Sequence, residues 1–262
     1  MRATIKRNFR LFMRRAVRRW LLTGLFPSKR YSFGPVTGGE GLVAMCLWNR
    51  PTRVADVLAM MDAQDFPGGV RLFLWNNNRA NHGIYEKAIE SYRANGGLRE
   101  VNLVKSPYNL GSIARFYWVR KLARTLDAPP VIVLDDDQDV RNDFVSVAIA
   151  SCKRRTLTAW WAWRMTDVYW ERTEAQVGDS IGHIGPGGMV ADSALFLDSD
   201  FFTQIPDRFG LLDDIWLSHF AVQKGYTLAK LPVDIDFVMH ETNQFFYQHD
   251  TKSEFYAYLK GF

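Results

Sequence analysis

The chain of 262 residues contains little cysteine, and its two cysteines, Cys46 and Cys152, lie far apart in the sequence. Two residues cannot build the disulfide framework of a small secreted domain, and no zinc-ligand spacing involves them. Cys46 stands in an apolar run and Cys152 beside a basic patch. We therefore expect two free thiols, as is usual for proteins of a reducing compartment.

Long uncharged apolar runs are also missing from the sequence. No segment reaches the roughly 18 residues that a membrane span requires, and the basic residues near the start are too spread out for a signal peptide with a clean apolar core. No linker rich in proline, serine or glycine divides the chain, and 47% of its residues are hydrophobic. We expect one α/β domain with a large core over residues 40–262, preceded by a helix over 1–30.

The first 27 residues have no acidic side chain and eight basic ones, whereas the rest of the chain holds 25 basic and 28 acidic residues. The positive charge is therefore concentrated at the N-terminus. On a helix, one face of this segment carries the apolar side chains Ile5, Phe9, Phe12, Met13, Ala16, Val17 and Trp20. The opposite face carries the arginines Arg7, Arg10, Arg14, Arg15, Arg18 and Arg19.

Three interpretations of this basic amphipathic helix are open. The favoured one is a helix lying in the plane of an anionic membrane surface, which implies a cytoplasmic protein attached peripherally to the cytoplasmic face of a membrane. In the second, the helix packs on the domain and its arginines face water. In the third it is a nucleic-acid-binding arm, which the large apolar face disfavours.

The body of the chain alternates apolar runs with helix-like stretches. Strands are predicted at 41–48, 70–75, 101–104 and 131–134, and helices from Pro51, over 83–94 and over 112–126. This alternation predicts an α/β fold with a mostly parallel central sheet flanked by helices, a Rossmann-like nucleotide-binding arrangement. The second half is less regular, with strand-like runs near 157–163, 189–197 and 227–233 and a helix over 214–224.

Polar residues follow three of these strands, at Trp48–Arg50, Asn76–Asn78 and Asp135–Asp139. The carboxyl ends of parallel strands lie at one edge of the sheet, where ligands bind in such folds. Four carboxylates within five positions after the VIVL run repel one another and require a cation or hydrogen-bond donors. Oxygen ligands of this kind suit Mg²⁺ or Mn²⁺, which also bind phosphates.

Other interpretations of the acidic cluster are weaker. A calcium-binding EF-hand loop needs glycine and glutamate where Val140 and Ser146 stand. An aspartyl-phosphate phosphatase needs threonine or valine where Asp139 stands. A solvated acidic loop fits poorly after a fully apolar strand.

The order of motifs resembles that of GT-A glycosyltransferases over about residues 40–245. The resemblance rests on W-N-R-P after the first strand, N-N-N after the second, N-L-G-S-I-A-R before a helix, D-D-D after VIVL, and L-L-D-D-I at 211–215. D-D-D matches the family's DxD motif. Together with D-D-I and the later E-T-N (Glu241–Asn243), it is closest to the exostosin-type branch.

The resemblance implies a role for each matching residue. Asp137 would ligate Mn²⁺ or Mg²⁺, His240 would reach the metal or the pyrophosphate, and Asp214 would be the catalytic carboxylate, with Asp213 beside it. The residues that would border the nucleotide-sugar donor are Trp48, Asn49, Arg50, Asn77, Asn109, Ser112, Arg115, Asp135 and Asp136. An acidic residue is commoner at the position of Asn77, so the base of the donor stays open.

The resemblance implies a metal-dependent glycosyltransferase that moves a sugar from a nucleoside diphosphate to a hydroxyl acceptor, such as a glycan or lipid-linked glycan in polysaccharide biosynthesis. One alternative is a nucleotidyltransferase on a related scaffold, although W-N-R-P replaces the glycine-rich loop such enzymes carry. The other is a non-enzymatic module that binds membrane or nucleic acid. A structural explanation needs no resemblance to a family. An aspartate at a helix start can cap backbone N–H groups and interact favourably with the positive end of the helix dipole. This accounts well for one of the two residues Asp213 and Asp214, but less well for both.

Several further residues have two interpretations each. His183, in the glycine-rich stretch 181–188, is expected in a loop, beside the site or merely connecting. Asp192 is an acceptor contact or a turn carboxylate. The aromatic residues Trp160, Trp161, Trp163, Tyr169 and Trp170 stack on sugar or fill the core.

Overall fold

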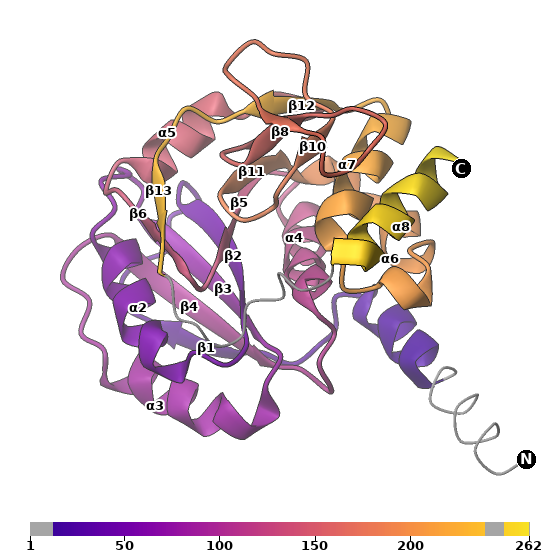
Figure 1. The fold of residues 1–262 in the computed structure, drawn as a ribbon. Coiled ribbons are helices and arrows are strands. Elements are labelled where there is room, and N and C mark those ends of the chain that lie inside the picture. The colour runs from indigo at the N-terminus through magenta and orange to yellow at the C-terminus, as the bar shows by residue number, and fades with distance from the viewer. Residues whose placement is uncertain (1–12, 239–248, 262) are drawn as a thin grey trace, which may run out of the picture.

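Four apolar runs form the parallel centre of an eight-stranded sheet in the computed structural model, which describes residues 13–238 and 249–261. They are β2 (Gly41–Leu47), β3 (Val70–Asn76), β4 (Leu98–Lys105) and β5 (Pro130–Asp135). The strand order is β1-β4-β3-β2-β5-β11-β7-β12, and β2 pairs in parallel with both β3 and β5. The predicted mostly parallel sheet is confirmed (Figure 1).

The outer strands include antiparallel pairs that the sequence pattern did not predict. The strand β1 (Lys29–Ser32) runs antiparallel to β4 at one edge, so the sheet begins before residue 40. The strand β11 (Met189–Asp192) lies antiparallel between β5 and β7 (Thr156–Ala159), and β12 (Thr227–Lys230) is parallel to β7.

Helices cover both faces of the sheet (Figure 1). The helices α2 (Val54–Asp62), α3 (His82–Ser91) and α5 (Phe144–Ser151) share one apolar core with the sheet. The other face is covered by α4 (Arg115–Thr125), α6 (Asp200–Thr203), α7 (Asp213–Gln223) and α8 (His249–Lys260). Short 3₁₀ helices are η1 (Pro51–Arg53), η2 (Arg79–Asn81), η3 (Ser112–Ala114), η4 (Ser193–Leu197) and η5 (Asp207–Phe209).

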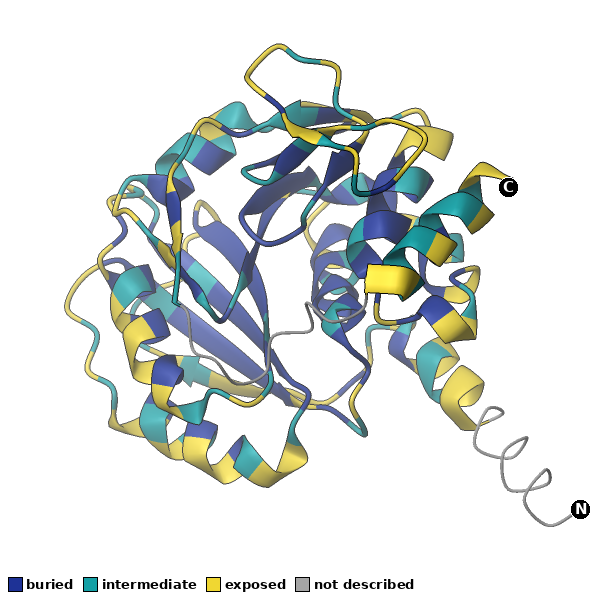
Figure 2. Ribbon diagram, in the orientation of Figure 1, coloured by how far each residue is buried: buried dark blue, intermediate teal, exposed yellow. Residues whose placement is uncertain are grey.

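The central strands β2 and β5 are almost entirely apolar because both of their faces are buried. Along β2, Leu42 and Ala44 face one core, and Val43 and Met45 face the other. This follows from the two-residue period of a strand. The buried residues accordingly concentrate in the sheet and on the inward helix faces (Figure 2).

Two small sheets lie outside the main one. The first has the order β10-β8-β9, from β8 (Ala162–Arg164), β9 (Thr173–Glu174) and β10 (His183–Ile184). The second pairs β6 (Gln138–Val140) with β13 (Ile235–Phe237). The predicted run 157–163 therefore splits between two sheets. The loop predicted for His183 is wrong, because His183 lies in β10 and its side chain is buried.

The described part of the basic N-terminal segment, residues 13–21, is helical and packs on the domain. Leu21 is buried, Val17 packs against the same core, and Arg18 pairs with Asp207 at 3.1 Å. Trp20, predicted on the apolar face, is 40% exposed. Among the described residues, no helix combines the length and apolarity of a membrane span.

Candidate active site

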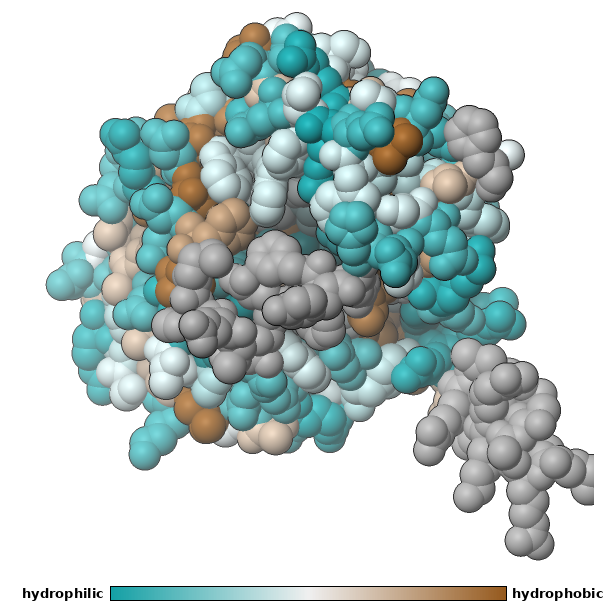
Figure 3. Space-filling model, viewed as in Figure 1, coloured by the Kyte–Doolittle hydropathy of each residue, from teal (hydrophilic) through white to brown (hydrophobic). Residues whose placement is uncertain are grey.

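A cleft of about 330 Å³ lies where the carboxyl ends of β2, β3 and β5 meet the first turns of η3, α4 and α7. This is the edge of the sheet at which the polar clusters were predicted to meet. On the face seen in Figure 3, the hydrophobic residues that the structure describes are scattered among hydrophilic ones. The cleft, which combines apolar and charged side chains, is the candidate ligand-binding site.

The cleft brings together most of the residues singled out from the sequence. Its lining includes every residue predicted to border the donor except Asn49, together with Asp137, Asp213 and Asp214. Asn49 is exposed outside the lining, where its side-chain oxygen accepts a hydrogen bond from Asn78 Nδ2 at 2.5 Å. The predicted metal ligand His240 and the E-T-N motif lie outside the described residues.

The acidic cluster, Asp135–Asp137, begins at the last residue of β5 and is held by arginines. Arg50 bridges two of its members, with Nη1 at 2.5 Å from Asp136 Oδ1 and Nη2 at 3.0 Å from Asp137 Oδ2. Burial raises the pKa of Asp136 even though Arg50 opposes the shift. Burial and the adjacent charge of Asp135 raise the pKa of Asp137 to about 6. The cluster is therefore only partly neutralised.

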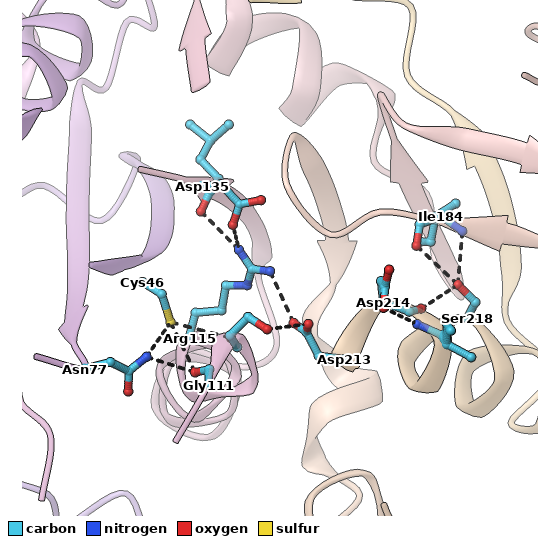
Figure 4. A network of polar contacts seen from close by, with 12 residues as sticks. Cys46, Asn77, Gly111, Arg115, Asp135, Ile184, Asp213, Asp214 and Ser218 are labelled. Atoms are coloured by element: carbon cyan, nitrogen blue, oxygen red, sulfur yellow. Dashed lines mark hydrogen bonds and ion pairs between the residues drawn. The ribbon is translucent and has the colours of Figure 1, made fainter. Parts of the chain in front are cut away.

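Arg115 connects this cluster to the start of α7 (Figure 4). Its guanidinium is 2% exposed and forms ion pairs with Asp135 and, at 3.2 Å, with Asp213 Oδ2. The hydroxyl of Ser112 donates to the other oxygen of Asp213. Gly111 immediately precedes with a φ of +77°, and an added Cβ would lie 2.6 Å from Leu211 Cδ2, so this turn into η3 requires glycine.

Asp213 and Asp214, the helix-start pair, open α7 but differ in environment. Burial raises the pKa of Asp213, against the opposing effect of Arg115. Burial also acts to raise the pKa of Asp214, but Lys252 and His183 outweigh it, and the pKa is lowered. Lys252 Nζ lies 3.0 Å from Asp214 Oδ2. In the pair, only Asp214 therefore has its pKa held below the usual range.

His183 lies behind Asp214, with its Nε2 4.0 Å from Asp214 Oδ2. Its Nδ1 is 3.1 Å from the Ser218 hydroxyl. That hydroxyl donates to the Asp214 carbonyl and accepts from the Ile184 N–H (Figure 4). Burial lowers the pKa of His183 to about 4, so the imidazole is neutral near pH 7. Near neutral pH His183 therefore supplies no charge to Asp214, and it lowers the Asp214 pKa only because it is protonated in acid.

The formal charges of the cleft do not balance. Five carboxylates and three cationic side chains line it, so two negative charges are unmatched among the described residues. This surplus fits a divalent cation. No three described metal-ligand side chains form a cage, but Mg²⁺ and Mn²⁺ commonly need only one or two carboxylates beside water and phosphate oxygens. Asp137, 15% exposed at its side chain, is placed to be such a ligand.

Asn77 lines the cleft, and its side chain also holds a neighbouring loop. Its Nδ2 donates to the Gly111 carbonyl at 2.9 Å and its Oδ1 accepts from the Leu110 N–H at 3.1 Å. Both ends of the amide thus fix the loop before η3, although the residue borders the cleft. Cys46 packs beside it as a free thiol, and burial raises its pKa to about 12, which makes it unreactive.

The sequence interpretation missed part of the lining, most importantly Lys252 and Phe237, whereas the 185–187 loop belongs to the glycine-rich stretch for which a place beside the site was one interpretation. The glycine pattern signalled that loop, but no local pattern distinguishes Lys252 from other helix lysines. Among the aromatic residues, Trp161 lines the cleft, whereas Tyr169 is buried. Asp192 is a turn carboxylate that accepts from the N–H groups of Ala194 and Arg155.

With this geometry in view, the structure can be compared with known ones. A mannosyltransferase from Pyrobaculum calidifontis, PcManGT, in complex with GDP-Man and Mn²⁺, is similar with a TM-score of 0.53 and 14% identity, over 96% of this chain and 71% of that one. The two proteins share their fold. This agrees with the predicted GT-A-like architecture.

The bifunctional glycosyltransferase WbbM is also similar, with a TM-score of 0.46 and 10% identity, over 77% of this chain and 40% of that chain. This chain therefore spans less than half the length of WbbM. No family model matches the sequence. No curated protein matches it either.

Proposed function

We propose that the protein is a metal-dependent glycosyltransferase that moves a sugar from a nucleoside diphosphate to a hydroxyl acceptor. The observation that carries this proposal is the cleft, which joins a partly neutralised acidic cluster to a second carboxylate pair at the ligand-binding edge of the sheet. The shared fold with PcManGT supports it. GDP-mannose and Mn²⁺, bound by that protein, are the natural first probes.

In this proposal Asp137 holds the divalent cation, with Asp135 beside it. When bound, Mn²⁺ or Mg²⁺ neutralises charge on the diphosphate of the donor. Trp48 and Arg50 border the nucleotide, and Arg50 also keeps Asp136 and Asp137 from repelling each other. The two unmatched negative charges of the cleft favour the binding of a divalent cation.

Asp214 is the catalytic carboxylate of the proposal. In an inverting reaction it accepts the proton of the acceptor hydroxyl while that oxygen attacks the anomeric carbon and the nucleoside diphosphate leaves. In a retaining reaction it stabilises the positive charge that develops on the sugar. Asp213 is less accessible for either task, because Arg115 and Ser112 occupy both of its oxygens.

The acceptor is proposed to be a glycan or lipid-linked glycan, reached at the cytoplasmic face of a membrane. The N-terminal segment supports this, since Met13 and Trp20 of its helix are 45% and 40% exposed beside exposed arginines, and Leu25, after the helix, is 78% exposed. Exchanging Arg7, Arg10, Arg15 and Arg19 for glutamine should reduce sedimentation with anionic liposomes and leave donor hydrolysis intact. Equal sedimentation of both proteins would remove the membrane contact from the proposal.

We also propose that the protein resembles the exostosin-type branch. This part of the proposal rests only on the D-D-D and D-D-I motifs, whose aspartates, Asp135–Asp137 and Asp213–Asp214, line the same cleft. A nucleotidyltransferase is disfavoured, because the segment after β2 contains no glycine and its Arg50 is engaged by the acidic cluster. Product analysis separates the two: free GDP or UDP indicates a glycosyltransferase, and pyrophosphate released from a nucleoside triphosphate indicates the rival.

The decisive experiment measures binding of GDP, UDP and GDP-mannose by calorimetry with and without Mn²⁺, followed by assays of donor hydrolysis. We expect Mn²⁺-dependent binding of at least one nucleotide, which Asp137→Ala weakens by about 10-fold or more. The matched control is Asp234→Ala, which removes an exposed carboxylate outside the cleft. Binding that ignores Mn²⁺, or equal losses in both variants, would contradict the proposal.

A further inference from the structure

Asp214 receives its counter-charge from a distant part of the chain. Lys252 belongs to α8, 38 residues further along, and its Nζ lies 3.0 Å from Asp214 Oδ2. The two side chains are 23% and 20% exposed, and both line the cleft. The contact is therefore a partly desolvated ion pair at the site itself, unlike the exposed pairs elsewhere on α8.

The position of Lys252 is fixed because α8 is anchored along its length. Phe255 is buried and stacks on Phe209 with ring centroids 4.2 Å apart. At the start of the helix, the ring of His249 stacks on Trp170 at 4.0 Å. Further along, the Tyr256 hydroxyl donates to the Thr166 carbonyl at 2.8 Å. A lysine on so fixed a helix presents its ammonium group at a defined point.

No other described group can take the place of Lys252 at Asp214. His183, from β10, is buried and neutral near pH 7. Tyr169, from the segment between β8 and β9, lies 3.3 Å from His183 Nε2 through its hydroxyl, but it is not a cation. Arg172, from the same segment, acts on His183 through its charge. Asp213, from α7 itself, adds a like charge. The other oxygen of Asp214 accepts a hydrogen bond from the Ile215 N–H at 2.9 Å. This bond orients the carboxylate but does not neutralise its negative charge.

We propose that Lys252 is a positioning residue, which holds the Asp214 carboxylate as an oriented anion facing the cleft. The inference rests on the proposed function of Asp214 and names the group on which that function depends. Without the ammonium group, Asp214 stands beside Asp213 with no cation in contact, and it takes up a proton at a higher pH. A protonated Asp214 can neither accept a proton nor stabilise a cation.

The test compares Lys252→Met, Lys252→Arg and the control Lys260→Met in the full chain. Lys260 lies on the same helix and pairs with Asp167 outside the cleft. The rate of GDP-mannose hydrolysis with Mn²⁺, or of the nucleotide sugar found active, is followed across pH. We expect Lys252→Met to lower kcat about 10-fold or more near neutral pH, because the ionised Asp214 carboxylate is no longer held in one orientation. Its acid limb should move up by about one pH unit, while the KM of the donor stays within about two-fold.

The other variants make the result specific. Lys252→Arg should restore most of kcat, and Lys260→Met should retain both kcat and the native acid limb. A loss in Lys252→Met that is equal at every pH overturns the inference, as does a rise confined to the KM of the donor. The latter outcome would identify Lys252 as a ligand of the donor instead.

A second measurement does not depend on turnover. The unfolding free energies of Lys252→Met, Asp214→Asn and the double variant form a cycle. We expect clear non-additivity near neutral pH that disappears in acid, where Asp214 is protonated. Additive effects at neutral pH would overturn the inference, even if the native protein proved inactive. Non-additivity without any nucleotide-sugar turnover would instead reject the proposed function and leave the ion pair established.

Discussion

The two groups of carboxylates in the cleft differ in how their charge is balanced. In the acidic cluster, one side chain, Arg50, serves both Asp136 and Asp137, and burial still raises the pKa of each. In the helix-start pair, Asp214 has a cation of its own, Lys252, and its pKa is lowered. The density of carboxylates alone therefore does not define a metal site. A carboxylate that shares its arginine gains from a cation, whereas one with its own lysine is already neutralised.

The largest expected effect comes from removing the residue that joins the two groups. Arg115→Met leaves Asp135 and the buried Asp213 without their guanidinium, and we expect a loss of about 3–5 kcal/mol in unfolding free energy. Denaturant titration measures this loss. Arg164→Met removes an exposed pair with Asp179 and should cost less than about 1 kcal/mol. Similar losses in both variants would show that Arg115 has no special role.

The next largest effect concerns the helix-start pair and is the loss of stability in acid caused by the buried His183. The pKa of His183 is about 4 in the folded protein and about 6.5 in the unfolded chain. Between these two pH values the imidazole is mostly protonated in the unfolded chain and mostly neutral in the folded protein. Stability is therefore lost as pH falls through this window. From about pH 7 to 4, the native protein should lose about 3 kcal/mol more than His183→Asn. Parallel stability curves would contradict the burial of a neutral imidazole.

A smaller effect tests the acidic cluster. Arg50→Met should cost about 2 kcal/mol without metal, because Asp136 and Asp137 lose a charged hydrogen-bond donor. Millimolar Mn²⁺ should recover a larger share of stability in this variant than in Arg115→Met, since a cation can replace Arg50 at the open cluster. Thermal melts of both variants with and without Mn²⁺ measure this. If Mn²⁺ stabilised Arg50→Met and Arg115→Met equally, the proposed difference between the two groups of carboxylates would be contradicted.

The smallest effect concerns the loop that closes over the cluster. A Cβ at Gly187 would lie 2.2 Å from Asp135 Oδ2, so Gly187→Ala should displace that carboxylate and cost about 1 kcal/mol. Gly83, in α3, has no heavy atom within 4 Å of an added Cβ, and Gly83→Ala should stabilise by up to about 1 kcal/mol. Unfolding titrations compare the two. A stabilising Gly187→Ala would show that the loop moves freely away from Asp135.

Much of the fold could be predicted from the sequence because its central strands are buried on both faces. The runs at 41–48, 70–75 and 131–134 lie within about one residue of β2, β3 and β5, where side chains that are apolar except for Arg71 permit few alternatives. The antiparallel strand β11 could not be predicted, because its partners β5 and β7 are chosen by long-range pairing. His183 was misplaced because the glycines around it dominate the local pattern.

The residues of the candidate site could be predicted where like charges are adjacent in the sequence. Contacts between residues far apart in the sequence could not be predicted. Asp135–Asp137 and Asp213–Asp214 stand out as adjacent like charges that need an explanation. The ion pairs of these carboxylates do not: Arg50 and Lys252 reach them across 86 and 38 residues. The W-N-R-P motif marked Arg50 as a site residue without showing its partners, whereas no local pattern marks Lys252. The resemblance placed Asn77 at the cleft, but only the fold shows that its amide fixes a loop.

The way the N-terminal segment enters the protein interior has a practical consequence. Phe26 packs edge-on against Trp75 of β3 and Trp118 of α4, at 5.0 and 5.1 Å, and Leu21 is 1% exposed. A shortened protein that begins after these residues would leave a void beside two tryptophans. Preparations for ligand-binding work should therefore start upstream of Met13, and poor solubility of a trimmed version would report this void rather than a lost lipid anchor.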